Sequence, residues 1–463
     1  MSRFTKMAYA TSDDMTFGRS KKPLSYGLGI KVGLGSVIPE INYLPRPGAE
    51  SSRERLVKEY VQYITQDCIK QAVNLGFPNL QLETEWIHTM SDDLGLAASV
   101  VSGQKEAIIN FHEKYGINLA VRHTVPDLRD ASYGLRAGMD TNGRPEKVIE
   151  CAEVACENGA DVLSIESLGG KELSDYAVTT GDITAFLFGA GFLASKDMES
   201  LWKELSGICK KHRVIPGGDS NCACSNTVMF MAGGHLDKDV QKTFSAVCRC
   251  ISAASALVVF ENGAVGPGKD CSYEGPIVKS ITGMPISSEG KHSHCAHMDL
   301  FGNLTAAVTD MWSNESVQYR HEFGGTSVQC WAGLIGYECS LMNTAISTGT
   351  EKTLRDLYTL SDRGRSPEGY ILSYDNAWKI GKSIIECGNS HYLRARTAGI
   401  TGAKLLIDGY NNKDIGLSRK QLETLYKIIR DLESLPDDED VFLDMCIRKY
   451  ADVRGFNIKN YGI

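Results

Sequence analysis

Three residues of metal-binding types follow three short, largely apolar runs of the chain. Glu166 ends the run DVLSIE, Cys222 follows VIPGGDSN, and Cys271 follows ALVVFENGAVGPGKD. Two thiolates and one carboxylate suit zinc, and a zinc ion with three protein ligands keeps a fourth position open for water or substrate. This pattern is typical of catalytic zinc sites, so we predict a metal centre at Glu166, Cys222 and Cys271.

These three side chains can meet only if the apolar runs are strands of one parallel sheet. Glu166 and Cys222 would then lie at or just past the carboxyl ends of their strands. The active sites of (β/α)8 barrels are built at that end of the barrel. Cys271 lies further beyond its apolar run, 256–261, so we expect a loop to bring it back to the other two residues.

Helix and strand patterns alternate along much of the chain, which is the order of a parallel sheet covered by helices. The expected strands are 36–43, 80–85, 118–125, 161–167, 214–220, 256–261, 284–289 and 316–323. Eight strands in this order predict an α/β fold, a (β/α)8 barrel of the TIM type. Pro39 weakens the first strand, because proline cannot donate a hydrogen bond to a sheet ladder.

The barrel would occupy residues 36–330, after an N-terminal extension of residues 1–35. Residues 331–463 form a C-terminal region whose patterns are helical. In it, Ser418 and Gln421 make a capping box before an apolar stripe. We expect this region to pack on the barrel or on a partner, and the sequence leaves both possibilities open.

Charge and composition exclude several classes of partner. The 463 residues include 57 acidic and 49 basic ones, a formal net charge of -8, which argues against binding the phosphates of nucleic acid. Residues 1–20 lack the apolar core of a secretion signal, and the apolar stretch 183–195 is shorter than the roughly 20 residues that span a bilayer. We interpret that stretch as a buried helix. We expect a cytoplasmic protein with mostly reduced cysteines that binds neither nucleic acid nor membrane.

Other residues could also bind a metal. Cys224 would point to the same side as Cys222 if the chain stays extended beyond the strand. A rival cluster follows the seventh expected strand and comprises His292, His294, Cys295 and His297. Its spacing also suits a metal, and it would indicate a zinc metallohydrolase built on the same barrel.

Three further polar residues end the second and third expected strands. Glu83 and Glu85 lie on one strand and His123 on the next. Each could supply a proton donor or orient a substrate at the barrel mouth. A ring of ion pairs or hydrogen bonds at the barrel rim accounts for them equally well.

Several segments of the chain resemble one enzyme family, that of the methanol:corrinoid protein co-methyltransferases. The segments are SVIPEINYLPRP, VLSIESLGGKE, GGDSNCACSNT, FENGAVGPGKDCSYE and WSNESVQYRHEFGGTSVQCW. The likeness continues to the closing KNYGI. The resemblance implies one zinc ion per chain on Glu166, Cys222 and Cys271, and it assigns no zinc role to Cys224 or to the histidines of 292–297.

By this resemblance, zinc would act as a Lewis acid on methanol, and the methyl group would pass to Co(I) of a corrinoid. The corrinoid would be carried by a separate protein in an oligomeric complex with this chain. The chain itself has no recognisable corrinoid-ligating motif of the DxHxxG type. A related methyltransferase for another small methyl donor, such as a methoxy compound, remains an alternative. A scaffold that only docks the corrinoid protein would make the three ligands incidental.

Overall fold

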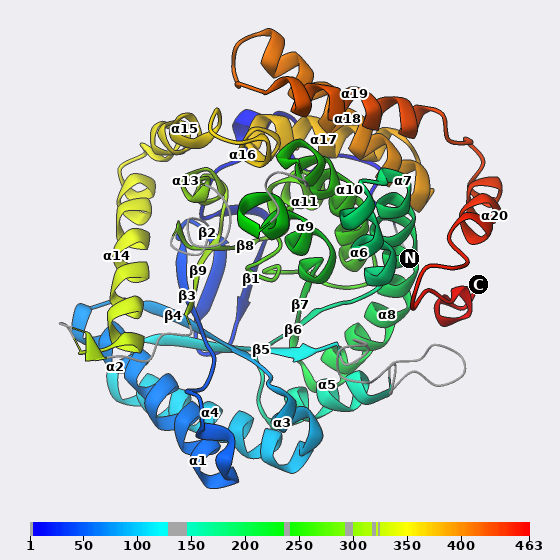
Figure 1. Ribbon diagram of the computed structural model, residues 1–463. Coiled ribbons are helices and arrows are strands. Elements are labelled where there is room, and N and C mark those ends of the chain that lie inside the picture. Colours follow the sequence, from blue (N-terminus) through cyan, green and yellow to red (C-terminus); the bar gives the residue numbers. More distant parts are fainter. Residues whose placement is uncertain (1–2, 128–145, 236–240, 292–299, 317–320, 323–324) are drawn as a thin grey trace.

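The computed structural model describes residues 3–127, 146–235, 241–291, 300–316, 321–322 and 325–463. Strands occupy the centre of the molecule, and helices surround them (Figure 1). A further set of helices from the end of the chain lies along one side.

Seven parallel strands form the central sheet. In spatial order they are β7 (Ile215–Ser220), β6 (Val162–Glu166), β5 (Asn118–Pro126), β4 (Asn79–Glu85), β3 (Ile38–Tyr43), β9 (Met311–Ser316) and β8 (Ser287–Glu289). Every pairing between neighbours is parallel. The expected α/β barrel is confirmed, and β3 keeps its place in the sheet in spite of Pro39.

The strand expected at residues 256–261 is wrong. These residues form the last turns of α10 (Lys242–Glu261), a helix that is buried along its whole length. An apolar run of this length fits a buried strand and a buried helix equally well, and periodicity does not separate the two. Packing against α18 (His391–Asn411) and other helices therefore decides the conformation.

An irregular stretch, which we call the closing segment (residues 264–271), takes the place in the ring that the sixth expected strand, 256–261, would have filled. Val265 N donates a hydrogen bond of 2.8 Å to the carbonyl of Pro216, beside β7. On the other side, Glu289 N of β8 donates to the carbonyl of Asp270 at 3.2 Å. The segment thus joins the two edges of the sheet and completes the ring.

The strand expected at 316–323 lies earlier in the chain, where β9 covers Met311–Ser316. Residues 317–320 lie outside the described part of the chain. The position of β9 was hard to predict because its two described inward positions differ, Met311 being apolar and Ser313 polar. Ser313, for example, pairs in register with the buried Glu40 of β3, so no alternation of apolar residues marks this strand.

The barrel interior around Glu40 is polar and fully buried. Glu40 accepts hydrogen bonds from Arg122 Nε at 2.8 Å, Gln81 Nε2 at 2.6 Å and Ser287 Oγ at 2.7 Å. Buried charges are tolerated when they are paired and hydrogen-bonded in this way. The inward faces of four strands are therefore joined by one network.

The N-terminal extension forms a hairpin of β1 (Arg19–Tyr26) and β2 (Ile30–Leu34) against the amino end of the strands. Tyr26 donates a hydrogen bond of 2.6 Å to Gln81 Oε1, and Leu28 bridges to Leu119 at the start of β5. The hairpin therefore closes the end of the barrel opposite to the mouth.

The outer helices follow their strands in sequence. They are α1 (Arg53–Lys58), η3 (Glu59–Gln66), α2 (Asp67–Leu75), α3 (His88–Asp92), α4 (Leu94–Tyr115), α5 (Glu146–Asn158), α8 (Ala194–His212), α10 and α14 (Ser327–Ser347). Shorter helical elements lie between these, namely α6 (Lys171–Thr180), α7 (Ile183–Phe186), η5 (Leu187–Leu193), α9 (Thr227–Phe230), α11 (Gly275–Thr282) and α13 (Gly302–Ala306). The stretch 183–195 is a buried helix, as expected.

The helices after α14 pack on one another and on α10, α11, α13 and η5. They are α15 (Glu351–Asp362), α16 (Pro367–Leu372), α17 (Tyr374–Glu386), α18, α19 (Arg419–Glu433) and α20 (Glu439–Lys449). The capping box of Ser418 and Gln421 is confirmed at the start of α19. The expected boundary at residue 331 falls inside α14, and the division into 1–35, 36–330 and 331–463 stays a prediction.

Helix α10 is long and apolar enough to cross a bilayer by length and composition alone. Every residue of its most apolar window is buried inside the protein. This burial is typical of the core helix of a folded domain, and Figure 1 shows α10 between the strands and the C-terminal helices.

Candidate metal centre

The three predicted ligands come from three neighbouring members of the ring. Glu166 is the last residue of β6 and pairs in register with Ser220, the last residue of β7. Cys222 follows two residues later, at the start of the π-helical turn η6 (Cys222–Asn226). Cys271 ends the closing segment beside β7. The irregular closing segment is the loop that brings Cys271 back to the mouth, although it follows a helix and not the strand expected at 256–261.

Two of the predicted ligands are in contact. The sulfur of Cys271 lies 3.2 Å from Oε1 of Glu166 and 3.2 Å from Oγ of Ser220. The structure pairs this sulfur in a disulfide, so both distances are sulfur–oxygen contacts, and in the reduced protein the same sulfur offers a thiolate. The side chain of Cys222 lies outside the described part of the chain.

The Glu166–Cys271 contact fits a zinc ion. Zinc binds thiolate at about 2.3 Å and carboxylate at about 2.1 Å, so two such ligands of a tetrahedral ion lie about 3.6 Å apart. The observed 3.2 Å is close to that separation. The Glu166 side chain is one-third exposed whereas Cys271 is buried, so the pair sits at the floor of an open mouth.

A second possible ligand group shares Cys271. Single ligand atoms of Asp270, Cys271 and Glu289 lie within 4.8 Å of one another. Both carboxylates already have partners, because Asp270 pairs with Lys269 at 2.5 Å and Glu289 accepts a short hydrogen bond from Tyr273. Glu166 has the weaker competing contact, and it is the better partner for Cys271.

One buried lysine connects the carboxylates around the centre. The Lys269 ammonium lies 2.5 Å from Asp270, 2.7 Å from Glu85, 3.0 Å from Glu83 and 3.4 Å from Glu166. Burial alone lowers the pKa of Lys269, but its negatively charged neighbours, Asp270 first, raise it well above its ordinary value. Lys269 is therefore a permanent cation beside the candidate ligands.

Glu166 is poised to exchange a proton for a cation. Removal from bulk water, and then the charge of Glu85, raise the pKa of Glu166 to about 8, against the attraction of Lys269. Metal ligands must be deprotonated, so a metal ion would displace the proton from a carboxyl of this kind. The chemistry of the donor set thus agrees with its geometry.

The reason for expecting Cys224 as a ligand is removed. The chain coils into η6 immediately after β7 and does not stay extended. Cys224 is buried, its sulfur lies 3.6 Å from the carbonyl of Gly169, and burial raises the pKa of the Cys224 thiol to about 12. The rival cluster of His292, His294, Cys295 and His297 lies outside the described residues.

The three polar residues predicted at strand ends, Glu83 and Glu85 of β4 and His123 of β5, lie in different surroundings. The alternative of a ring of ion pairs or hydrogen bonds is confirmed for Glu83 and Glu85, which both contact Lys269. His123 faces away from the barrel interior, next to the inward-facing Arg122, and accepts a hydrogen bond of 3.2 Å from Trp86 Nε1. Burial lowers the pKa of His123 to about 3, so it is a neutral core residue.

The sequence interpretation missed Lys269 and Asp270. Both stand in the GPGKDC motif directly before Cys271, but a Lys–Asp pair in a glycine-rich stretch looks like a solvated turn. The only available signal was their adjacency to a predicted ligand.

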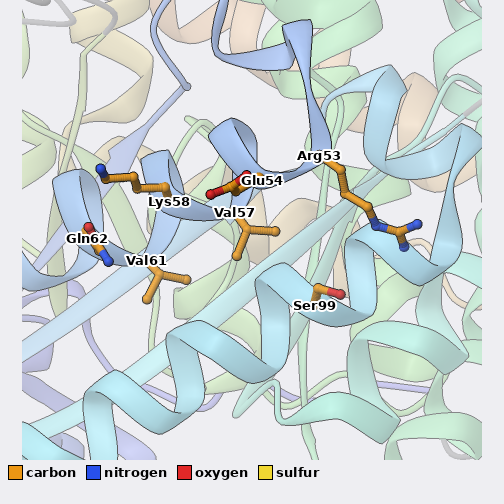
Figure 2. Close-up of a pocket in the computed structure, with 7 residues that line it drawn as sticks. All are labelled: Arg53, Glu54, Val57, Lys58, Val61, Gln62 and Ser99. Atoms are coloured by element: carbon orange, nitrogen blue, oxygen red, sulfur yellow. The ribbon is translucent and has the colours of Figure 1, made fainter.

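A separate groove lies on the outside of the barrel, with a volume of about 540 Å³ (Figure 2). Its lining residues come from α1, η3 and α4, and none is one of the predicted ligands. They are Arg53, Glu54, Val57, Lys58, Val61, Gln62 and Ser99. The groove contributes nothing to the metal centre.

Comparison with known proteins identifies the family. Residues 1–462 match the family described as methanol-cobalamin methyltransferase B subunit. The methanol--corrinoid protein co-methyltransferase of Methanosarcina barkeri is 48% identical over 461 residues, which is 99% of each chain. The crystal structure of the methanol:cobalamin methyltransferase complex MtaBC from the same organism contains a chain that superimposes with a TM-score of 0.96 at 48% identity, with both chains covered completely. The resemblance seen in the sequence is confirmed, and the chain belongs to the family of methanol-cobalamin methyltransferase B subunits.

Proposed function

We propose that this chain transfers the methyl group of methanol to the cobalt of a corrinoid on a second protein, with zinc held by Glu166, Cys222 and Cys271. Family membership over the whole chain supports the reaction, and the complex formed by the Methanosarcina relative supports the separate corrinoid partner. The observation that carries the metal site is the 3.2 Å contact between Glu166 and Cys271. It lies where three neighbouring members of the ring end.

Methanol needs activation because hydroxide is a very poor leaving group. A zinc ion on these ligands would supply Lewis acidity toward an alcohol oxygen and so weaken its bond to carbon. The chain arranges its ligands in advance. Lys269 holds Glu166 by an ion pair of 3.4 Å, and Ser220 contacts the sulfur of Cys271. Such supporting contacts orient metal ligands before the metal binds.

The charge of the site also bears on the reaction. Two thiolates and one carboxylate bring three negative charges to a divalent ion, which blunts its acidity. Lys269 lies beside the carboxylate and offsets part of that charge. The partner's cobalt would attack the methyl carbon from the side opposite to the oxygen.

The bonds and electrons balance with one additional proton. The electron pair of Co(I) forms the new bond to the methyl carbon, and the pair of the breaking carbon–oxygen bond stays on oxygen. That oxygen must take up a proton to leave as water. The proposed function therefore requires an acid near the site.

We propose a cytoplasmic location as well. Eleven described cysteines, from Cys68 to Cys446, are free thiols. Buried free thiols on this scale are typical of reducing compartments.

Metal analysis of reduced protein tests the ligand set. We expect one zinc ion per chain in the wild type, and loss of stoichiometric zinc in Cys222→Ala and Cys271→Ala. The matched control is Cys224→Ala, which should keep its zinc because Cys224 contacts Gly169 and not the ligands. Full zinc occupancy in Cys271→Ala, with the fold intact by circular dichroism, would contradict the site.

A further inference from the structure

Glu83 is a buried carboxyl whose two oxygens have different surroundings. Oε1 accepts a hydrogen bond of 2.5 Å from Thr124 Oγ1 and lies 3.0 Å from the Lys269 ammonium. Oε2 is buried and has no hydrogen-bond partner among the described residues. Because both donors occupy Oε1, a proton carried by this carboxyl belongs on Oε2.

The surroundings of Glu83 favour its protonated form. Burial first, and then the negative charge of Asp270, raise the pKa of Glu83 well above its ordinary value. Glu40 acts in the same direction, whereas Lys269 and Arg122 oppose the shift. These groups face Glu83 from the closing segment, β3 and β5, and their balance favours the protonated carboxyl.

Lys269 places this acid beside the metal centre. The Lys269 ammonium contacts Glu83 at 3.0 Å and Glu166 at 3.4 Å, so a single ammonium group bridges the two carboxyls. Asp270, which holds the other side of the ammonium, directly precedes Cys271. Glu83 therefore lies close to the candidate metal centre.

A neighbouring residue also carries buried polar atoms. Asn42 of β3 pairs in register with Glu83, and neither atom of its buried amide has a partner among the described residues. A buried polar group left unsatisfied costs about 1–3 kcal/mol. Two such groups side by side on one inward face favour a small polar guest, such as an alcohol or water.

We propose that Glu83 is the general acid that protonates the oxygen leaving methanol, an assignment that rests on the proposed function. The proton on Oε2 moves to the oxygen as the carbon–oxygen bond breaks, and the products are water and the Glu83 carboxylate. Solvent entering the mouth returns the proton before the next turnover. In the reverse direction the carboxylate takes a proton from water as methanol forms.

The experiment compares Glu83→Gln with wild type in single-turnover methylation of the reduced corrinoid protein at saturating methanol. The amide keeps the shape of the side chain and an acceptor for Thr124 but has no acidic proton. General acids contribute about 100-fold to 10,000-fold. We expect unchanged zinc content, unchanged affinity for the corrinoid protein and a rate at least about 100-fold lower.

Two further readouts separate an acid from a structural residue. The wild-type rate should fall with rising pH as Glu83 loses its proton, and the residual rate of Glu83→Gln should lack that fall. Glu83→Asp, which restores an acid, should recover part of the rate. If Glu83 were only structural, the pH profile of Glu83→Gln would match that of wild type, and Glu83→Asp would not be faster than Glu83→Gln.

Glu40→Gln is the matched control. It makes the same change in a buried inward carboxylate of the next strand, where both oxygens are already hydrogen-bonded. We expect a lower melting temperature and, on the low-pH side of the rate profile where Glu83 keeps its proton in both proteins, a rate per folded molecule within about threefold of wild type. An equal loss of rate in both variants would show general damage to the interior and overturn the assignment.

A zinc-loaded Glu83→Gln protein within about threefold of the wild-type rate would also overturn it. If that variant does not fold, the wild-type pH profile decides, because a rate that stays flat at high pH excludes an acid of this kind. Failure of the proposed function looks different. In that case zinc-loaded wild-type protein would not methylate the corrinoid protein at any pH.

Discussion

Glu166 uses one oxygen for two contacts. Its Oε1 lies 3.2 Å from the sulfur of Cys271 and 3.4 Å from the ammonium of Lys269. A metal ion bound to this oxygen would therefore share it with a fixed positive charge. The strength of Glu166 as a ligand is set in part by a residue that does not touch the metal.

Glu166→Gln should separate ligand charge from ligand shape. The amide is nearly isosteric but neutral, and neutral oxygen is a poorer zinc ligand than carboxylate. We expect reduced zinc occupancy and, with zinc restored, methyl transfer at least about tenfold slower, a barrier increase of about 1.4 kcal/mol. Single-turnover rates with zinc quantified in the same sample measure both effects.

Two results would contradict this expectation for Glu166→Gln. Wild-type rates without zinc would remove the metal from the mechanism. Wild-type rates with zinc restored would reduce Glu166 to a replaceable ligand.

The sequence predicts the proximity of Glu166 and Cys271 better than it predicts the surroundings of this pair. Glu166 and Cys271 could be paired in advance because residue type and position at strand ends carry the information. The role of Lys269 could not, because its four carboxylate neighbours come from β4, β6 and the closing segment. Contacts across several strands depend on the barrel's register, which is not visible in the composition of one motif.

At the scale of elements, the loop after β6 depends on a glycine. Gly170 has φ of +76°, and a Cβ there would lie 2.1 Å from the backbone oxygen of Gly189 in η5. Neither the positive φ nor the backbone contact can be relieved by a side-chain movement. This close approach fixes the loop that leads away from Glu166.

Gly170→Ala should therefore destabilise the protein by more than the cost of a positive φ alone, which is about 1–2 kcal/mol. The matched control is Gly181→Ala, because Gly181 has φ of +66° but open space around its Cβ position. We expect a clearly lower melting temperature for Gly170→Ala than for Gly181→Ala. Equal melting temperatures in a thermal scan would contradict the close packing of the loop on η5.

Strands were predicted correctly where the residue pattern marked them, and a helix was mistaken for a strand where it is buried on all sides. Strands β4 to β7 lie within a few residues of their expected positions. The run 256–261 is helical because α10 is enclosed by other helices, and enclosure on all sides removes the periodicity that would identify it. Similarly, the stripe of α19 predicted that this helix packs, but not on which neighbour.

At the scale of the whole molecule, the chain supplies one half of a reaction. It has no recognisable corrinoid-ligating motif, and the Methanosarcina relative was crystallised as a complex. We expect the purified chain to carry no corrinoid by visible absorption and to elute with its corrinoid protein in size-exclusion chromatography. The corrinoid protein alone serves as the control. Tightly bound cobalamin in the isolated chain would contradict this division of labour.

The closing segment has a further consequence for how a barrel can be equipped. Along a regular strand, consecutive side chains alternate between the two faces, so three successive residues cannot all enter the lumen. Here Lys269 reaches Glu83, Asp270 accepts a hydrogen bond of 2.9 Å from Ser313, and Cys271 contacts Glu166. Because the closing segment is not a pleated strand, three consecutive residues place a cation, an anion and a sulfur atom in the lumen.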